Sequence, residues 1–220
     1  MNNLPFDIVG FDLDGTLLDT SRDLGAAVNH ALGLIGRPAV PESAVSGLIG
    51  GGSRLMLRRA LALTGGEDGV DIDALYPRLL AYYEAHIAVH TALYPGGAAM
   101  LDALESAGVR LALVTNKPEG LALKLLGELD LRPRFGCVIG GGGVYPLKPA
   151  PDALHAMVAA LGGGRAAYVG DTTFDTRAAQ AAGLPCIAVS FGFNDVAVDQ
   201  LDAAAVINHF DQLVPTLATL

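Results

Sequence analysis

Two aspartates stand two residues apart in the segment VGFDLDGTLLDT, directly after a short apolar run. At the edge of a hydrophobic core, the carboxylates of Asp12 and Asp14 repel each other unless a cation offsets their charge. Three kinds of site bring carboxylates this close: a calcium-binding loop, a capped turn, and a catalytic pair beside a metal ion. In the last case one carboxylate can act as a nucleophile and the other as a general acid and base.

The calcium-loop interpretation fails on the spacing of the ligands. An EF-hand loop needs oxygen ligands at its first, third and fifth positions, glycine at the sixth and glutamate at the twelfth. Counted from Asp12, the last three of these positions hold Thr16, Leu17 and Asp23. The segment therefore does not encode such a loop.

Polar side chains also stand at the ends of two later apolar runs. Thr115 and Asn116 close the run VRLALVTN, and Asp171 closes the run AAYVGD, with Asp175 four residues later. Taken alone, the second of these segments could be a turn that caps a helix. Ligands of open parallel sheets bind beyond the carboxyl ends of the strands, so we expect all of these side chains to converge on one site.

A site with this many carboxylates needs a positive charge, and the chain has only three lysines: Lys117, Lys124 and Lys148. Lys148 follows the glycine-rich end of the apolar run CVIGG, so we predict that it is the cation of the site. Lys117, in TNKPEG, is a rival by position, and we predict that it is a helix-entry or rim residue. Gly15, directly after Asp14, would let the chain turn sharply there.

The elements that must position these residues follow from short apolar runs. Each run has the length of a strand and is apolar almost throughout, which is typical of strands buried on both faces. Helical patterns separate the runs from Val109 onward, and this alternation predicts an α/β fold with a Rossmann-like parallel sheet. The runs are FDIVGFD, VRLALVTN, CVIGG, AAYVGD, PCIAVS and AAVIN.

One stretch interrupts this alternation because its pattern is helical only. We predict an inserted, mostly α-helical cap domain over residues 19–91 and a catalytic α/β core domain over residues 1–18 and 92–220. His86 and His90 lie one helical turn apart in the insertion without a third ligand in view, so we expect them to line a cap helix. The C-terminal segment NHFDQLVPTLATL is predicted to form a closing helix.

Composition indicates which classes of partner are excluded and in which compartment the protein is expected. The formal net charge of -9 argues against nucleic acids and anionic membrane surfaces as partners, because an acidic protein is repelled by a polyanion. No uncharged run reaches the length of a membrane helix, and the N-terminal segment has no export-signal pattern. Cys137 and Cys186 stand alone in apolar surroundings, which predicts reduced thiols and a cytoplasmic location.

Taken together, four motifs resemble those of the haloacid dehalogenase-like superfamily of phosphohydrolases. They are DLDGT, TN, KPAP and GDTTFD, and their order and spacing match over essentially the whole chain. The helical insertion directly after the first motif resembles the subgroup with a helical cap at this point. Within that subgroup, IGGGSRLMLRRAL and YPGGAAMLDALESAGVRLALVTNKP are most similar to the phosphoglycolate phosphatases.

The resemblance implies a mechanism built on the paired aspartates. Asp12 would attack phosphorus to form an aspartyl-phosphate, and Asp14 would protonate the leaving group and then activate water. A magnesium ion, Mg2+, would be bound by Asp12, the backbone carbonyl of Asp14 and Asp171. Asp175 would steady the metal-bound waters or the lysine of the site.

The remaining site residues implied by the resemblance bind the substrate. Thr115, Asn116 and Lys148 would hold the phosphoryl oxygens. Arg54 follows a run of glycines at the start of a cap helix, and we predict that it binds the carboxylate of 2-phosphoglycolate. The alternative is that the glycines form a hinge and that Arg54 is solvated.

Several activities remain open at this point. The substrate is expected to be a small phosphomonoester, either phosphoglycolate or another small phosphate such as a sugar phosphate, and a phosphomutase is a further alternative. From a different class, a phospho-accepting signalling module or a binding protein without turnover is possible. The protein is expected to act as a monomer or a homodimer.

Overall fold

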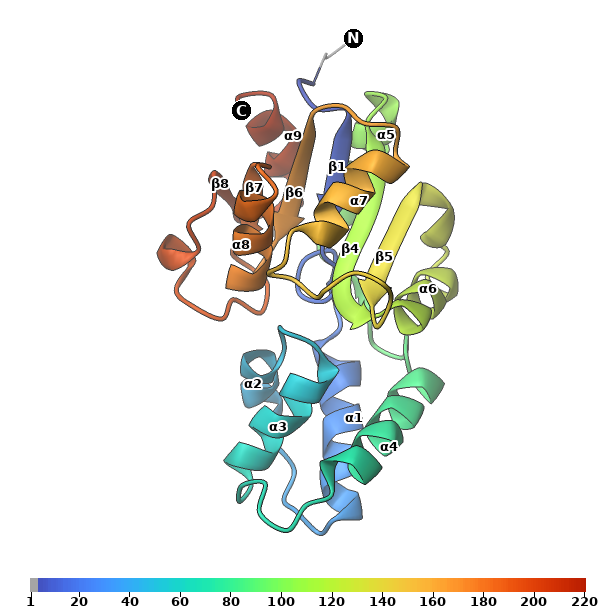
Figure 1. Ribbon diagram of the computed structural model, residues 1–220, viewed down its shortest axis with the longest axis vertical. Helices are drawn as coiled ribbons and strands as arrows, with labels where there is room; N and C mark the ends of the chain where they lie inside the picture. The colour runs from blue at the N-terminus through green and yellow to red at the C-terminus, as the bar shows by residue number, and fades with distance from the viewer. Residues whose placement is uncertain (1–3) are drawn as a thin grey trace.

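The computed structural model describes residues 4–220, and a six-stranded sheet lies at its centre (Figure 1). The strands lie in the order β5-β4-β1-β6-β7-β8, and every neighbouring pair is parallel. Each strand falls within one of the apolar runs except β4, which extends two residues beyond its run, and this arrangement confirms the predicted α/β fold. The strands are β1 (Ile8–Phe11), β4 (Arg110–Pro118), β5 (Cys137–Gly141), β6 (Ala166–Gly170), β7 (Cys186–Val189) and β8 (Ala205–Ile207).

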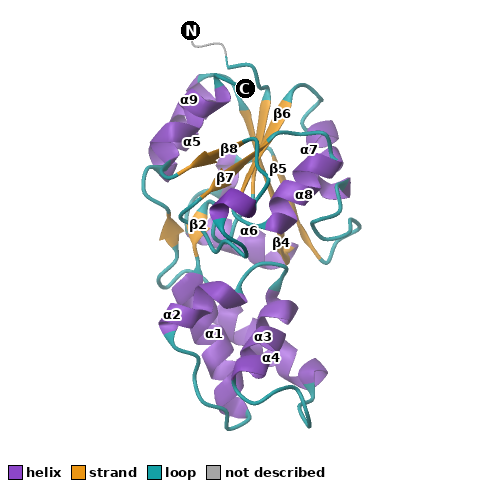
Figure 2. Ribbon diagram, turned by 90° about the vertical axis from the view of Figure 1, so that its left-hand side faces the viewer, coloured by secondary structure: helices purple, strands orange, loops and turns teal. Residues whose placement is uncertain are grey.

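Helices cover both faces of this sheet (Figure 2). Successive side chains of a strand point to opposite faces, and both Ile8 and Val9 of β1 are fully buried. Ile8 packs in the core that includes α7 and α8, whereas Val9 belongs to the larger core that includes α5, α6 and α9. These helices are α5 (Gly97–Ser106), α6 (Glu119–Glu128), α7 (Asp152–Ala160), α8 (Thr173–Ala181) and α9 (Leu213–Leu217).

Short 3-10 helices complete this part of the molecule, at Arg132–Arg134, Val198–Gln200 and Phe210–Gln212. The last of them alters the predicted C-terminal helix. It occupies the beginning of the segment, so α9 covers only 5 residues.

The helices α1 to α4 lie beyond the sheet edge toward which the arrowheads of β4 and β5 point (Figure 1). We call residues 21–85 the cap. Its first helix buries one face, on which Leu24, Val28 and Leu32 recur at the helical spacing. The cap helices are α1 (Ser21–Leu34), α2 (Glu42–Val45), α3 (Ser53–Leu63) and α4 (Ile72–Ala85), with a 3-10 helix at Ser46–Leu48.

The two chain segments that connect the cap to the sheet are bound to each other. They form an antiparallel pair of short strands, β2 (Leu18–Asp19) and β3 (Ala92–Leu93). One carboxylate oxygen of Asp23 in α1 also accepts hydrogen bonds from the backbone N–H of His90, at 2.9 Å, and of Thr91, at 2.9 Å. The entry to the cap and the exit from it are therefore fixed side by side.

Candidate active site

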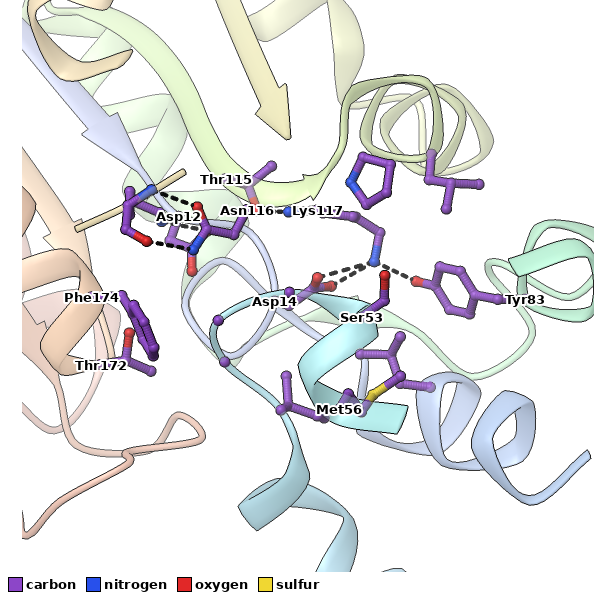
Figure 3. A pocket seen from close by; sticks show the side chains of 18 of the residues that line it. Asp12, Asp14, Ser53, Met56, Tyr83, Thr115, Asn116, Lys117, Thr172 and Phe174 are labelled. Carbon is purple, nitrogen blue, oxygen red and sulfur yellow. Dashed lines mark hydrogen bonds and ion pairs between the residues drawn. The ribbon is translucent and has the colours of Figure 1, made fainter. Parts of the chain in front are cut away.

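A cavity of about 50 Å³ lies where the cap covers the carboxyl ends of β1 and β4 (Figure 3). A volume of this size holds only a few water molecules, each of which needs about 10–15 Å³. Its lining includes the predicted site residues Asp12, Asp14, Thr115, Asn116 and Lys148. The sheet edge and the cap enclose these residues between them.

Lys148 lies at the base of the cavity and is almost completely buried. Its Nζ atom is 2.6 Å from the carboxylate of Asp175, 2.8 Å from the hydroxyl of Tyr168 and 3.1 Å from a backbone carbonyl of β4. It also lies 2.9 Å from Oδ1 of Asp12. Burial lowers the pKa of Lys148, but the charges of Asp12 and Asp175 outweigh that effect and raise it above its usual value. The lysine therefore stays charged, as predicted.

Asn116 holds Lys148 in place. Its side-chain oxygen accepts a hydrogen bond from the backbone N–H of Lys148, at 2.8 Å, and its side-chain nitrogen donates to the backbone carbonyl of Lys148, at 3.0 Å. Both ends of the amide are thus used on one residue. The side chain thus positions Lys148, and its contact with phosphoryl oxygens stays a prediction.

Thr115 and Asn116 reach the cavity because β4 loses its regular pairing at this point. The register between β4 and β5 shifts between Val114 and Pro118, and such irregularities redirect side chains at sheet edges. The hydroxyl of Thr115 accepts a hydrogen bond from the backbone N–H of Lys117, at 3.2 Å. Its own O–H therefore remains available as a donor to a ligand.

Three carboxylates, those of Asp12, Asp171 and Asp175, have oxygens within 4.8 Å of one another. Asp175 has its oxygens engaged, since it bonds Lys148 and also forms a capping box with Thr172 at the start of α8. Burial raises the pKa of Asp12 to about 6, although Lys148 partly opposes this. Burial, followed by the charges of Asp175 and Asp12, also raises the pKa of Asp171 well above its usual value. This cluster lacks enough positive charge of its own.

The cluster fits a hard divalent cation. Within residues 4–220, Oδ1 of Asp12 is a buried oxygen without a hydrogen-bond partner, because the three donors of Lys148 have other acceptors. Each oxygen of Asp171 accepts only one bond, from the Thr16 hydroxyl at 2.8 Å and the Phe193 N–H at 2.7 Å. Carboxylate oxygens with unused lone pairs are the ligands that Mg2+ prefers.

Gly15 keeps the space around Asp171 open. It has a φ of 86°, as the predicted sharp turn requires, and a Cβ atom there would collide with the carboxylate of Asp171. A Cβ atom at Gly192 would collide with the same side chain. Two glycines thus form the walls of the carboxylate cluster.

Lys117 directly precedes the N-cap of α6, as the helix-entry alternative predicted, but it is buried, so the rim alternative is wrong. Its side chain is 3% exposed, and the residue lines the cavity. Nζ lies 2.9 Å and 3.0 Å from the two carboxylate oxygens of Asp14, and 2.8 Å from the hydroxyl of Tyr83 in α4 (Figure 3). Burial raises the pKa of Tyr83 to about 12, so its hydroxyl keeps its proton. The pair of Asp14 and Lys117 is therefore completed by a residue of the cap.

Arg54 does not line the cavity, contrary to the prediction for this residue. Its guanidinium pairs with Asp73 at 2.6 Å and lies over the ring of Tyr76, and its side chain is about half exposed. The preceding residues 50–52 do line the cavity. The turn made by the glycines lies at the site, but the helix that follows it directs Arg54 outward.

Four residues of the site escaped the sequence analysis. Tyr168 carries the only hydroxyl in the otherwise apolar run AAYVG, which is a signal that could have been noticed. Thr16 lies inside the first motif and could have been found by its proximity to the paired aspartates. Tyr83 and Phe193 gave no signal, because one contributes from the distant cap and the other through its backbone N–H.

Comparison with known proteins agrees with this fold. The haloacid dehalogenase-like hydrolase family matches residues 9–189. The chain therefore belongs to the haloacid dehalogenase-like hydrolase family. None of the helices in residues 4–220 is both long enough and apolar enough to cross a membrane.

Individual relatives match over nearly their whole length. The phosphoglycolate phosphatase of Agrobacterium fabrum is 40% identical over 94% of this chain and 90% of the relative. That of Cereibacter sphaeroides is 37% identical over 96% of this chain and 98% of the relative. The crystal structure of a predicted phosphoglycolate phosphatase from Haemophilus somnus has a TM-score of 0.89 and 26% identity, covering 96% of this chain and 97% of that one.

Proposed function

We propose that this phosphatase hydrolyses 2-phosphoglycolate to glycolate and phosphate in a magnesium-dependent reaction. The observation that carries the proposal is Oδ1 of Asp12, a carboxylate oxygen without a hydrogen-bond donor that forms an ion pair with Lys148 in a small cavity closed by the cap. A nucleophile so placed suits a short phosphomonoester. The relatives named phosphoglycolate phosphatase support the choice of ester.

In the first half of the reaction, Asp12 attacks phosphorus and the bond from phosphorus to the ester oxygen breaks. The product is an aspartyl-phosphate, which divides hydrolysis into two easier displacements. Asp14 donates a proton to the departing alkoxide oxygen. In the second half, Asp14 takes a proton from a water molecule that attacks the aspartyl-phosphate, and Asp12 is released with free phosphate.

Negative charge accumulates on the phosphoryl oxygens during both displacements, and the chain offers two groups to bind them. The hydroxyl of Thr115 is a free donor, and Lys148 provides positive charge at the base of the cavity. Mg2+ would be held by Asp12, Asp171 and the backbone carbonyl of Asp14, where it would offset the repulsion between carboxylate and phosphate. Asp175 would fix Lys148 from behind.

The proposal also covers the location and the oligomeric state of the enzyme. Both cysteines, Cys137 and Cys186, are free thiols, which suits the proposed cytoplasmic location. We propose that the enzyme acts as a monomer or homodimer on a small soluble ester.

The test is a phosphate-release assay with Mg2+ over a panel of 2-phosphoglycolate, sugar phosphates and nucleotides. Phosphoglycolate should have the highest kcat/KM, and the Asp12→Asn variant should retain its fold, measured by circular dichroism, but lose turnover. Substantial turnover by Asp12→Asn would remove Asp12 as the nucleophile. A higher kcat/KM for a sugar phosphate than for phosphoglycolate would identify that sugar phosphate as the preferred substrate. Phosphoryl transfer without net release of phosphate would identify a mutase.

A further inference from the structure

Lys117 is the second cation of the cavity, and the hydrolysis described above does not use it. Among the described residues that line the cavity, Lys117 and Lys148 are the only ones with a positive charge. Lys148 is committed to the base of the site, where Asp12 and Asp175 lie within 3 Å of it. Lys117 lies between Asp14 of the core and Tyr83 of the cap.

The surroundings of Lys117 on the cap side are almost entirely apolar. The cavity wall above it is formed by Leu24, Ile49, Met56, Leu79 and Leu80. An anionic group entering this region meets one cation, Lys117, and the neutral hydroxyls of Ser53 and Tyr83, of which that of Tyr83 lies 2.8 Å from Nζ of Lys117. In such surroundings an unpaired anionic group is costly, so a substrate tail with a negative charge must reach this lysine.

We propose that Lys117, held in place by Tyr83 of the cap, binds the carboxylate of the substrate and thereby determines specificity. The inference rests on the proposed hydrolysis of phosphoglycolate and names the residue that recognises its second anionic group. It assigns to Lys117 the role that sequence analysis had given to Arg54, whose guanidinium is bound to Asp73 outside the cavity.

The geometry allows Lys117 to exchange partners without leaving its place. Its ammonium group has three donors, two of which face the oxygens of Asp14 and one the hydroxyl of Tyr83. A substrate carboxylate can replace one oxygen of Asp14, while the other contacts keep the lysine oriented. An ester with a neutral tail leaves Lys117 paired with Asp14, so this lysine adds nothing to the binding of that ester.

The experiment compares two substrates that differ only in the tail: 2-phosphoglycolate and ethyl phosphate. The variant Lys117→Met should lower the ratio of their kcat/KM values by roughly tenfold to a hundredfold, the usual effect of one hydrogen bond to a charged group. If the loss of the Asp14 ion pair lowers kcat/KM, it does so for both substrates, so this effect cancels in the ratio. Ethyl phosphate therefore serves as the internal reference for the chemical step.

Lys124→Met is the matched control, because Lys124 also joins the core to the cap. It donates to the backbone carbonyl of Glu84, at 2.7 Å, from an exposed position outside the cavity. The ratio should stay unchanged in this variant. A fall as large as that of Lys117→Met would show that any loosened cap lowers the preference, and would overturn the proposal.

A second variant decides the matter if Lys117→Met does not fold. Tyr83→Phe keeps the ring but removes the hydroxyl that orients the lysine, so KM for phosphoglycolate should rise roughly fivefold relative to KM for ethyl phosphate. Equal changes on both substrates in either folded variant, or none in Tyr83→Phe, would overturn the proposal. A wild-type enzyme without preference for phosphoglycolate would instead refute the proposed function, before any variant is made.

Discussion

The two buried lysines of the cavity differ in what holds them. Lys148 is fixed by groups that all belong to the core, and its backbone is clamped by the side chain of Asn116. Lys117 shares its contacts between Asp14 in the core and Tyr83 in the cap. The first environment exists whenever the sheet is folded, whereas the second is complete only when the cap lies over the sheet. The difference separates the chemistry common to phosphomonoesters from the recognition of one ester.

The largest effect should follow from removal of the lysine held by the core. Lys148→Ala leaves Asp12 and Asp175 as buried, uncompensated charges, so kcat/KM should fall by roughly a thousandfold, equivalent to about 3–5 kcal/mol. The loss should be similar for phosphoglycolate and ethyl phosphate, in contrast to Lys117→Met. Steady-state kinetics on both esters provide the test, with thermal unfolding as the control for folding. A loss confined to phosphoglycolate would erase the distinction between the two lysines.

A smaller effect is expected on thermal stability, which should depend on both Mg2+ and pH. The pKa of Asp12 in the folded protein is about 6, above its ordinary value of 3.8, because of burial. Metal-free protein therefore has the full stability associated with this group below about pH 4 and loses it as pH rises through about 6. Mg2+ should offset that loss, so the increase in Tm on adding Mg2+ should be larger at pH 8 than at pH 5. Equal increases, measured by differential scanning fluorimetry, would argue against Asp12 as a ligand.

The smallest effect is expected for the arginine outside the cavity. Arg54→Ala removes only a solvent-exposed pair with Asp73, whose contribution is about 0.2–1 kcal/mol at most. We expect kcat/KM for both esters to change by less than about twofold. A tenfold loss specific to phosphoglycolate would restore Arg54 as the residue that reads the carboxylate and remove Lys117 from that role.

The core of the site was predictable because its residues stand at strand ends. A buried parallel strand is recognisable from its apolar run, and its carboxyl end fixes which edge the next residue occupies. Asp12 and Asp171 lie at this edge of the sheet as expected, and Lys148 reaches it from the loop that follows β5. Helix α5, in the segment GGAAMLDALESAG, lies outside the helices predicted from the sequence.

The residues that sequence analysis misjudged depend on the local path of the backbone. Lys117 turns inward because β4 leaves its register with β5 after Val114, and a residue pattern does not reveal such a shift. Arg54 turns outward because residues 50–52 all have positive φ, between 68° and 96°, before α3 begins. Consecutive glycines leave the direction of the following helix open, so only the folded chain settles which side chain faces the cavity.

The short ribbon formed by β2 and β3 makes the cap an insertion whose two ends are neighbours. Closing a longer chain segment between adjacent ends adds only about 0.6 kcal/mol for each doubling of its length. The sheet that carries Asp12 and Lys148 is therefore nearly indifferent to how many residues lie between Asp19 and Ala92. Exchange of this one segment for another of different size would preserve the reaction centre, so new substrate ranges are accessible by recombination as well as by point substitution.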